Sequence, residues 1–207
     1  MCKYSGIVIS VNANNEPRLA PPGGGLPKHE LFIGRLMFAF KRRTGSRDSF
    51  NAEFNRERSR VRQLVESCDR NELAQRVLIA RAIGMEDSSR NWSVLMTLDH
   101  LRIVHESMNR VIGDLTNGKI PGGTASTATV KPSPQVTADV IAEYEKSCDV
   151  LLATVAAATS LKAKLRFAHP WFGPLDAHGW HALAAGHLGI HRVQLERIVS
   201  GLNSSVK

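Results

Sequence analysis

Hydrophobic residues recur at helical intervals along most of this chain, and no strand pattern competes with them. Between Glu30 and Val65 they keep this spacing with a predicted break at Thr44-Gly45-Ser46, which indicates one interrupted helical element. The clearest pattern predicts an amphipathic helix from about residue 92 to about residue 116. Its apolar positions are Leu95, Leu98, Leu101, Val104, Met108, Val111 and Leu115.

Two more long helices are predicted in the second half of the chain. The first extends from about Pro134, a residue tolerated in a first helical turn, to about Arg166. The second begins after Asp176, which can cap it, and ends just before Gly201. A shorter connector helix is predicted over residues 72–84.

The connections between these helices decide the fold class. The stretch from Asn117 to Pro134 is rich in Gly, Pro, Thr and Ser and has no aromatic anchor, so it predicts a long surface loop. A loop of this length can cross from one end of a bundle to the other, whereas shorter links leave neighbouring helices antiparallel. We therefore expect an all-α fold, a four-helix bundle with a long crossover loop between its second and third bundle helices.

Two segments fall outside this helical pattern. The prolines before residue 28 and the run Gly23-Gly24-Gly25 exclude a regular helix, so residues 1–28 are expected to form an irregular N-terminal extension. Residues 29–207 would then form the bundle domain. Residues 167–174 contain two prolines and a glycine and predict a structured turn. The four aromatic residues assigned chiefly to packing the bundle ends are Trp92, Trp171, Phe172 and Trp180, and Trp171 or Phe172 could instead wall a pocket.

The formal charge of +8 would indicate nucleic-acid binding if the basic residues formed a patch. Between Lys41 and Arg62, however, they alternate with acidic residues such as Glu53 and Glu57 at helical spacing. This alternation is typical of a solvated helix face with i,i+4 ion pairs. We therefore do not expect nucleic acid to be the partner.

The sequence also bears on compartment. No apolar stretch reaches the ~20 residues that span a bilayer, and no export signal is recognised at the N-terminus, so no membrane partner is expected. Cys2, Cys68 and Cys148 are far apart, without the spacing of a disulfide framework or a zinc knuckle. Reduced thiols and a cytoplasmic location are therefore expected.

The candidate chemistry rests on three of the eight histidines. His187 and His191 are four residues apart on the last helix and share one face, and His100 lies among apolar residues in the helix over residues 92–116. Three neutral imidazoles leave a divalent metal an open coordination position, as in catalytic sites. Spacing alone leaves a second interpretation open, in which these histidines are hydrogen-bonded core residues. We do not assign the other five histidines to the site; His105 and His181 are expected to face solvent or a neighbouring helix.

Other candidate residues are weaker. Cys148 lies on the buried stripe of its predicted helix and could approach the site, but a thiol in an apolar core is usually inert. Glu143 and Glu145 could accept a hydrogen bond from a ligand imidazole, although solvated surface is the simpler interpretation. The chain has no GxSxG elbow, P-loop or dinucleotide-binding glycine motif. Composition and motifs thus identify no catalytic residue.

Two stretches resemble the DinB-like family. Trp92 precedes the pair His100-Leu101 by about two turns, as in the second bundle helix of that family. The stretch from His169 to Leu175, followed by Trp180, His187 and His191, resembles its last-helix segment. The resemblance covers roughly residues 30–200 and implies a four-helix bundle in which one histidine of the second helix and two of the fourth bind a metal. Those ligands correspond to His100, His187 and His191.

The resemblance also implies a class of activity. Characterised relatives include transferases and isomerases that use low-molecular-weight thiols, and homodimers are expected on family grounds. We therefore expect a metal-dependent enzyme in which a divalent transition metal, zinc or nickel, activates a water or thiol for transfer or hydrolysis on an unidentified small molecule. The resemblance adds a low-molecular-weight thiol as a candidate cofactor. The alternative is a non-enzymatic helical binding protein, associated with stress response or nucleic acid, in which the histidines are structural.

Overall fold

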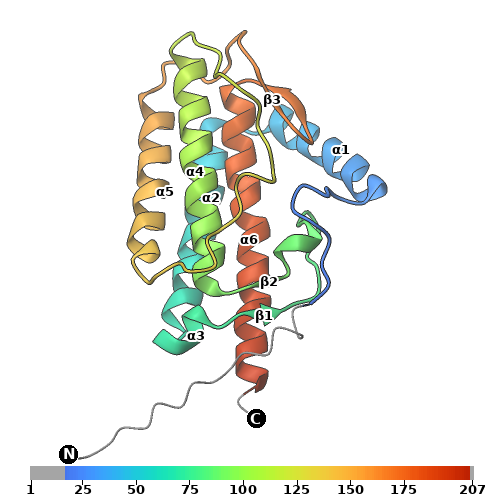
Figure 1. Ribbon diagram of the computed structural model, residues 1–207. Coiled ribbons are helices and arrows are strands. Elements are labelled where there is room, and N and C mark those ends of the chain that lie inside the picture. Colours follow the sequence, from blue (N-terminus) through green and yellow to red (C-terminus); the bar gives the residue numbers. More distant parts are fainter. Residues whose placement is uncertain (1–16, 206–207) are drawn as a thin grey trace, which may run out of the picture.

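The computed structural model describes residues 17–205 and confirms the all-α four-helix bundle (Figure 1). The bundle helices surround one apolar core, which includes Phe54, Leu98, Leu151 and Leu195. Neighbouring helices pack as α4 on α5, α4 on α6 and α2 on α6. The four helices of the bundle are α2 (Arg47–Glu66), α4 (Val94–Thr116), α5 (Val140–Ala157) and α6 (Ala177–Ser205).

The predicted crossover is present as the connection from α4 to α5, over residues 117–139. The loop returns along the length of the bundle, so α4 and α5 are parallel to each other (Figure 1). Helices α2 and α6 are both antiparallel to that pair. Ser133 near its end donates its backbone N–H to Asp99 Oδ2 in the first half of α4, at 2.9 Å. This hydrogen bond ties the end of the loop to α4, and α5 begins at Val140 and not at Pro134 as predicted.

The predicted break at Thr44-Gly45-Ser46 separates α1 (Lys28–Thr44) from α2. Ser46 begins α2 with a reciprocal capping box, in which its Oγ accepts from the Ser49 N–H and Ser49 Oγ accepts from the Ser46 N–H. α1 lies outside the bundle and has no buried residue. The bundle's first helix is therefore α2 alone.

Short elements replace the predicted connector helix over residues 72–84. A single turn, α3 (Arg70–Ala74), is followed by β1 (Val77–Leu78), which pairs antiparallel with β2 (Asn91–Trp92). The 3-10 turn η1 (Asp87–Ser89) lies between these strands. The helical prediction was wrong here because the ladder with β2 takes up the backbone groups of Val77 and Leu78, a long-range pairing that periodicity does not reveal.

Two helix ends also differ from the prediction. α5 stops at Ala157 and not near Arg166, because the next carbonyl, that of Ala158, accepts from Arg47 Nη2 at 2.6 Å and the backbone there is extended. The residues up to α6 include a hairpin of β3 (Phe167–His169) and β4 (Gly173–Leu175). α6 continues through Gly201, where a Cβ would lie 2.6 Å from Val77 Cγ1. The glycine permits close packing against β1 and does not end the helix.

The alternating charges of α2 predicted a solvated face with i,i+4 pairs, but two of its arginines pair with another helix, and the Arg58 side chain is only 13% exposed. Arg58 and Arg62 both contact Glu145 on α5, at 2.5 and 2.7 Å, and Arg58 also contacts Asp149 at 2.6 Å. Glu145 therefore serves the α2–α5 interface and not an imidazole. Glu143, its side chain 58% exposed, pairs with Arg102.

Candidate metal centre

Three histidines from two helices converge at one point inside the bundle. His187 and His191 lie one turn apart on α6, and His100 faces them from α4. Nε2 of His100 lies 3.1 Å from Nε2 of His191 and 3.3 Å from Nε2 of His187. One ring nitrogen from each residue lies within 4.8 Å of the other two, and no other group of His, Cys, Asp or Glu among the described residues has this arrangement. The structure thus brings all three predicted ligands together.

The hydrogen bond of His100 assigns its tautomer. Its Nδ1 lies 2.5 Å from the carbonyl oxygen of Val130 in the crossover loop. A carbonyl can only accept, so Nδ1 must carry the proton and donate it. In the neutral imidazole, Nε2 is then unprotonated and presents its lone pair toward His187 and His191.

The tautomer of His191 follows from a chain of two hydrogen bonds. Gln194 donates from Nε2 to the carbonyl of Ser89 at 2.7 Å, which fixes the amide so that its Oε1 faces His191. His191 Nδ1 lies 2.6 Å from that Oε1 and is therefore the donor. Nε2 of His191 is consequently also unprotonated when the ring is neutral.

Two lone pairs therefore face each other at 3.1 Å in a buried setting, and His100 and His191 are each 5% exposed. Such an arrangement is repulsive unless a cation lies between the nitrogens. Two imidazole nitrogens about 2.0–2.1 Å from a tetrahedral zinc ion are about 3.3 Å apart, which matches these separations. The donor set therefore fits a divalent transition metal.

Burial keeps these imidazoles neutral. The loss of water and the neighbouring histidines hold the pKa of His100 and of His187 well below the ordinary value, and burial lowers the pKa of His191 to about 4. Nδ1 of His187 is buried with no hydrogen-bonding partner among the described residues. The three rings are thus neutral at neutral pH, and those of His100 and His191 direct an unprotonated nitrogen at the triad.

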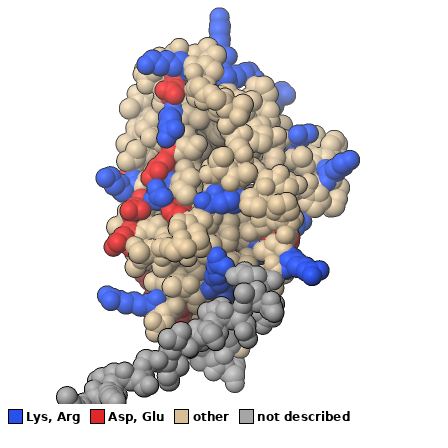
Figure 2. Space-filling view, viewed as in Figure 1, with Lys and Arg blue, Asp and Glu red and all other residues tan. Residues whose placement is uncertain are grey.

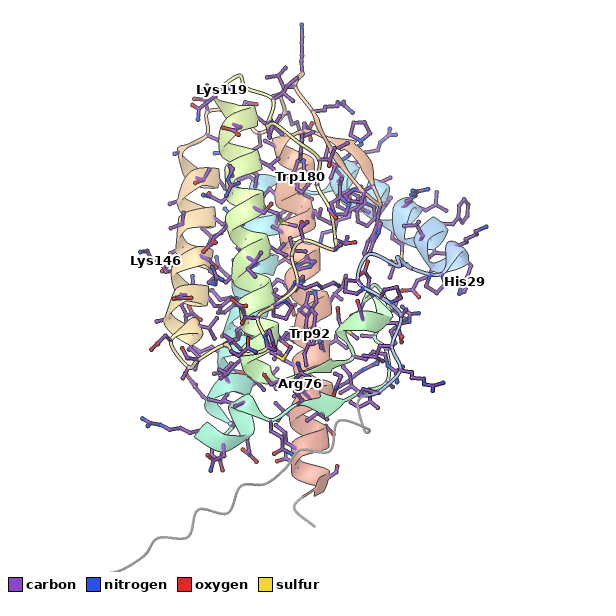
Figure 3. The ribbon with its side chains drawn as sticks, in the orientation of Figure 1. His29, Arg76, Trp92, Lys119, Lys146 and Trp180 are labelled. Atoms are coloured by element: carbon purple, nitrogen blue, oxygen red, sulfur yellow. The ribbon has the colours of Figure 1, made fainter. Side chains whose placement is uncertain are left out.

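The Trp92 ring and residues 127–131 of the crossover loop lie around the triad. Trp92, on β2 and labelled in Figure 3, lies beside the triad. Its ring stacks on His191 with ring centroids 6.3 Å apart and an interplanar angle of 11°, and its centroid lies 5.1 Å from that of the His100 ring. Lys131, next to Val130, lies over the Trp92 ring and pairs with the buried Glu86 at 2.7 Å. Glu86 also accepts from Thr127 Oγ1 and from the Gly23 N–H of the N-terminal segment. One carboxylate thus ties together the segments that cover the site.

Glu86→Gln is expected to destabilise the contacts that hold the crossover loop beside the triad. Burial opposes ionisation of Glu86, but the hydrogen bond and charge of Lys131 outweigh it, so its pKa lies below the ordinary value. The neutral amide would leave the Lys131 ammonium without its partner and present N–H groups to other donors. We expect the free energy of unfolding, measured by urea titration, to fall by about 1–3 kcal/mol. The control Glu106→Gln removes a more exposed partner of Arg102 and should change it by less than about 0.5 kcal/mol. Equal effects of both substitutions would contradict this role of Glu86.

The remaining candidates lie elsewhere. Cys148 is fully buried 3.6 Å from His105 Nδ1, and burial raises the pKa of its thiol to about 12, so it is an inert core thiol. His105 and His181 are fully buried against neighbouring helices and do not face solvent. Phe172 packs on Phe38 of α1 with centroids 4.5 Å apart, so it serves packing and not a pocket at the triad.

Sequence reasoning missed three contributors to the site. Val130 acts through its backbone carbonyl, which carries no sequence signal. The role of Gln194 did have a sequence signal, since this residue lies three positions after His191 on the same helix face. Trp92 was assigned to packing at the bundle end, whereas pairing of β2 with β1 places its ring against the imidazoles of His100 and His191.

Comparisons with known proteins identify the class of this bundle. The sequence pattern of the DinB superfamily matches residues 53–195, a range that contains all three histidines. The chain therefore belongs to the DinB superfamily. No curated protein matches.

One solved structure supports the fold. The crystal structure of TT2238, a four-helix bundle protein, resembles the chain with a TM-score of 0.55 at 22% sequence identity. The similarity covers 73% of this chain and 98% of that chain. Within residues 17–205, no helix combines the length and apolar character needed to cross a bilayer.

Proposed function

We propose that this chain is a metal-dependent enzyme in which His100, His187 and His191 hold one divalent transition ion. One observation supports this proposal above all: two unprotonated nitrogens, Nε2 of His100 and Nε2 of His191, face each other. Burying such a pair costs free energy unless a cation lies between them. When bound, the ion would act as a Lewis acid that activates a water or a thiol for transfer or hydrolysis on a small molecule. Three imidazoles suit zinc, nickel, copper and iron alike, and zinc or nickel is the ion we expect here.

The residues around the triad would orient the ligands and exclude water. Val130 and Gln194 fix the rings of His100 and His191 and direct their Nε2 atoms toward one point. Trp92 shields the same two rings. No carboxylate or thiol joins the three imidazoles in the described structure, so further coordination positions remain for a thiol, a water or the substrate.

Access would be from the side of His187. This residue is half-buried, whereas the other two are almost completely covered. A surface pocket of about 660 Å³ lies between α4 and α5 and is lined by Arg102, Lys146 and Ser147. None of the three triad histidines lines it. We therefore propose that the substrate binds beside the triad, on the side of His187.

Other observations are consistent with this proposal. The rival function, a binding protein that uses the basic first helix, would draw on its basic side chains, and two of these, Arg58 and Arg62, are instead tied to α5. Cys68 and Cys148 are free thiols, which supports the expectation of a reducing, cytoplasmic compartment.

The proposed activity is tested by removing and restoring the metal. Chelated protein, protein reloaded with zinc or nickel, and reloaded His191→Ala are assayed for hydrolysis of small esters and amides and for transfer of low-molecular-weight thiols to small electrophiles. We expect turnover by the reloaded protein alone. Turnover that survives complete chelation, or that His191→Ala retains, would contradict the proposal.

A further inference from the structure

The outward side of α1 is an apolar surface that no described part of the protein covers. Its large side chains are all more than half exposed, from 53% for Ile33 to 69% for Phe40. Their spacing places them along one side of the helix. A contiguous exposed surface of this kind marks a site of contact with a protein or a membrane. This surface, called the α1 face below, consists of Phe32, Ile33, Leu36, Met37 and Phe40.

The opposite side of α1 attaches the helix to the body. Phe38 packs on Phe172 of the β3–β4 hairpin, and Arg35 Nε donates to the Trp171 carbonyl at 2.6 Å. Figure 1 shows α1 projecting from the bundle, and Figure 3 places His29 at its outer end. The helix is therefore held in place without its apolar face, which remains available to a partner.

The charges around the α1 face have one sign. Lys28 and Arg43 are exposed near the two ends of the helix, and neither forms an ion pair with the described residues. Glu30, the one acidic residue of α1, points to the body and pairs with Arg81 at 2.5 Å. In the view of Figure 2 the projection formed by α1 shows tan and blue atoms but no red. An anionic partner would complement this surface.

This combination favours a lipid surface over a second copy of the chain. Two copies that met through the α1 face would bring their unpaired basic residues together, which is unfavourable. A helix with Phe and Leu on one side and basic residues beside them instead suits the boundary between anionic headgroups and acyl chains. We propose that α1 docks this protein onto an anionic lipid bilayer, with the α1 face inserted into the interface.

This surface is independent of the metal centre. α1 precedes the residues 53–195 that match the DinB superfamily, so the α1 face belongs to this chain and not to the matched family region. The proposal departs from the expectation of no membrane partner, which rested on the lack of a spanning segment, because this helix would lie in the plane of the surface.

Flotation with lipid vesicles tests the proposal. The full chain is mixed with vesicles of phosphatidylcholine and phosphatidylglycerol, or of phosphatidylcholine alone, and separated on a density gradient. We expect it to float with the anionic vesicles at least about tenfold more efficiently than with the neutral ones, and the difference to shrink as salt is raised.

Paired variants separate the α1 face from general hydrophobicity. Phe32→Ser with Phe40→Ser should lower the affinity for anionic vesicles by about tenfold or more, because two inserted rings are lost. The control, Ile120→Ser with Val150→Ser, removes exposed apolar side chains distant from α1 and should float as the wild type does. Circular dichroism should show both proteins folded, since all four side chains are exposed.

Three results would overturn the proposal. The wild type could float equally with anionic and neutral vesicles or with neither, or the α1 variant could float like the wild type. Light scattering could also show a dimer that the α1 variant converts to a monomer, in which case a second copy covers the α1 face.

Discussion

His191→Ala is expected to lower the zinc affinity of the protein by about a hundredfold or more. Structural zinc sites bind with roughly 10–16 kcal/mol, so one ligand contributes on the order of 3 kcal/mol. Gln194→Leu keeps all three ligands but removes the hydrogen bond that orients His191, and should cost between about tenfold and a hundredfold. Competition with a chromogenic chelator measures both affinities.

The matched control for these variants is His178→Ala. His178 lies on the same helix and is also 5% exposed, but its Nε2 contacts the Arg42 carbonyl and not the triad. Its replacement should leave the zinc affinity unchanged. If His178→Ala weakened zinc binding as much as His191→Ala does, the effect would reflect general loss of structure, and the assignment of His191 as a ligand would lose its support.

Acid is expected to destabilise the fold steeply below about pH 6. Burial lowers the pKa of His105 to about 3 and, together with His178 and nearby cations, that of His181 to about 4. The unfolded chain, with histidines at their ordinary pKa near 6.5, binds more protons than the folded chain between these values, so stability rises with pH across this window and is lost as pH falls. Each histidine of this kind contributes about 1.4 kcal/mol per pH unit to the slope, and in metal-free protein the three triad histidines add to it.

His181→Leu separates this contribution from general acid denaturation. Both ring nitrogens of His181 are buried without a partner among the described residues, and the ring contacts the edge of Phe50. An apolar residue there should be tolerated at pH 7 and should reduce the slope below pH 6 by about 1.4 kcal/mol per pH unit, the contribution of one histidine. Urea unfolding in metal-free buffer between pH 7 and 4.5 measures how the free energy of unfolding of each protein changes with pH. An unchanged slope would show that His181 does not titrate in this way.

The fold could be predicted from the sequence wherever a single helix carries its own signal. The stripe from Leu95 to Leu115 and the break at Gly45 are local patterns, and both are confirmed in the structure. The ends of α5 and the region of β1 are set by contacts between distant residues, such as Arg47 with the Ala158 carbonyl. Periodicity contains no information about such contacts, and the predicted boundaries were wrong there.

The candidate site also has parts that local sequence patterns predict and parts that depend on contacts between distant residues. His187 and His191 share a face by spacing alone, and the inward position of His100 follows from its apolar neighbours, so the set of ligands was predictable. That they converge depends on the crossing of α4 and α6, for which the sequence offered only a family resemblance. The carbonyl of Val130 and the ring of Trp92 reach the triad through a loop and a two-residue strand, and neither could be foreseen.

The central claim is that the three imidazoles hold a metal, and the metal content of the purified, untagged protein tests it most directly. Plasma mass spectrometry on the wild type, beside folded His100→Ala and His187→Ala variants, should find about one equivalent of zinc or nickel in the wild type and far less in either variant. A wild type that remains empty after incubation with both metals would contradict the claim and leave the histidines as core residues.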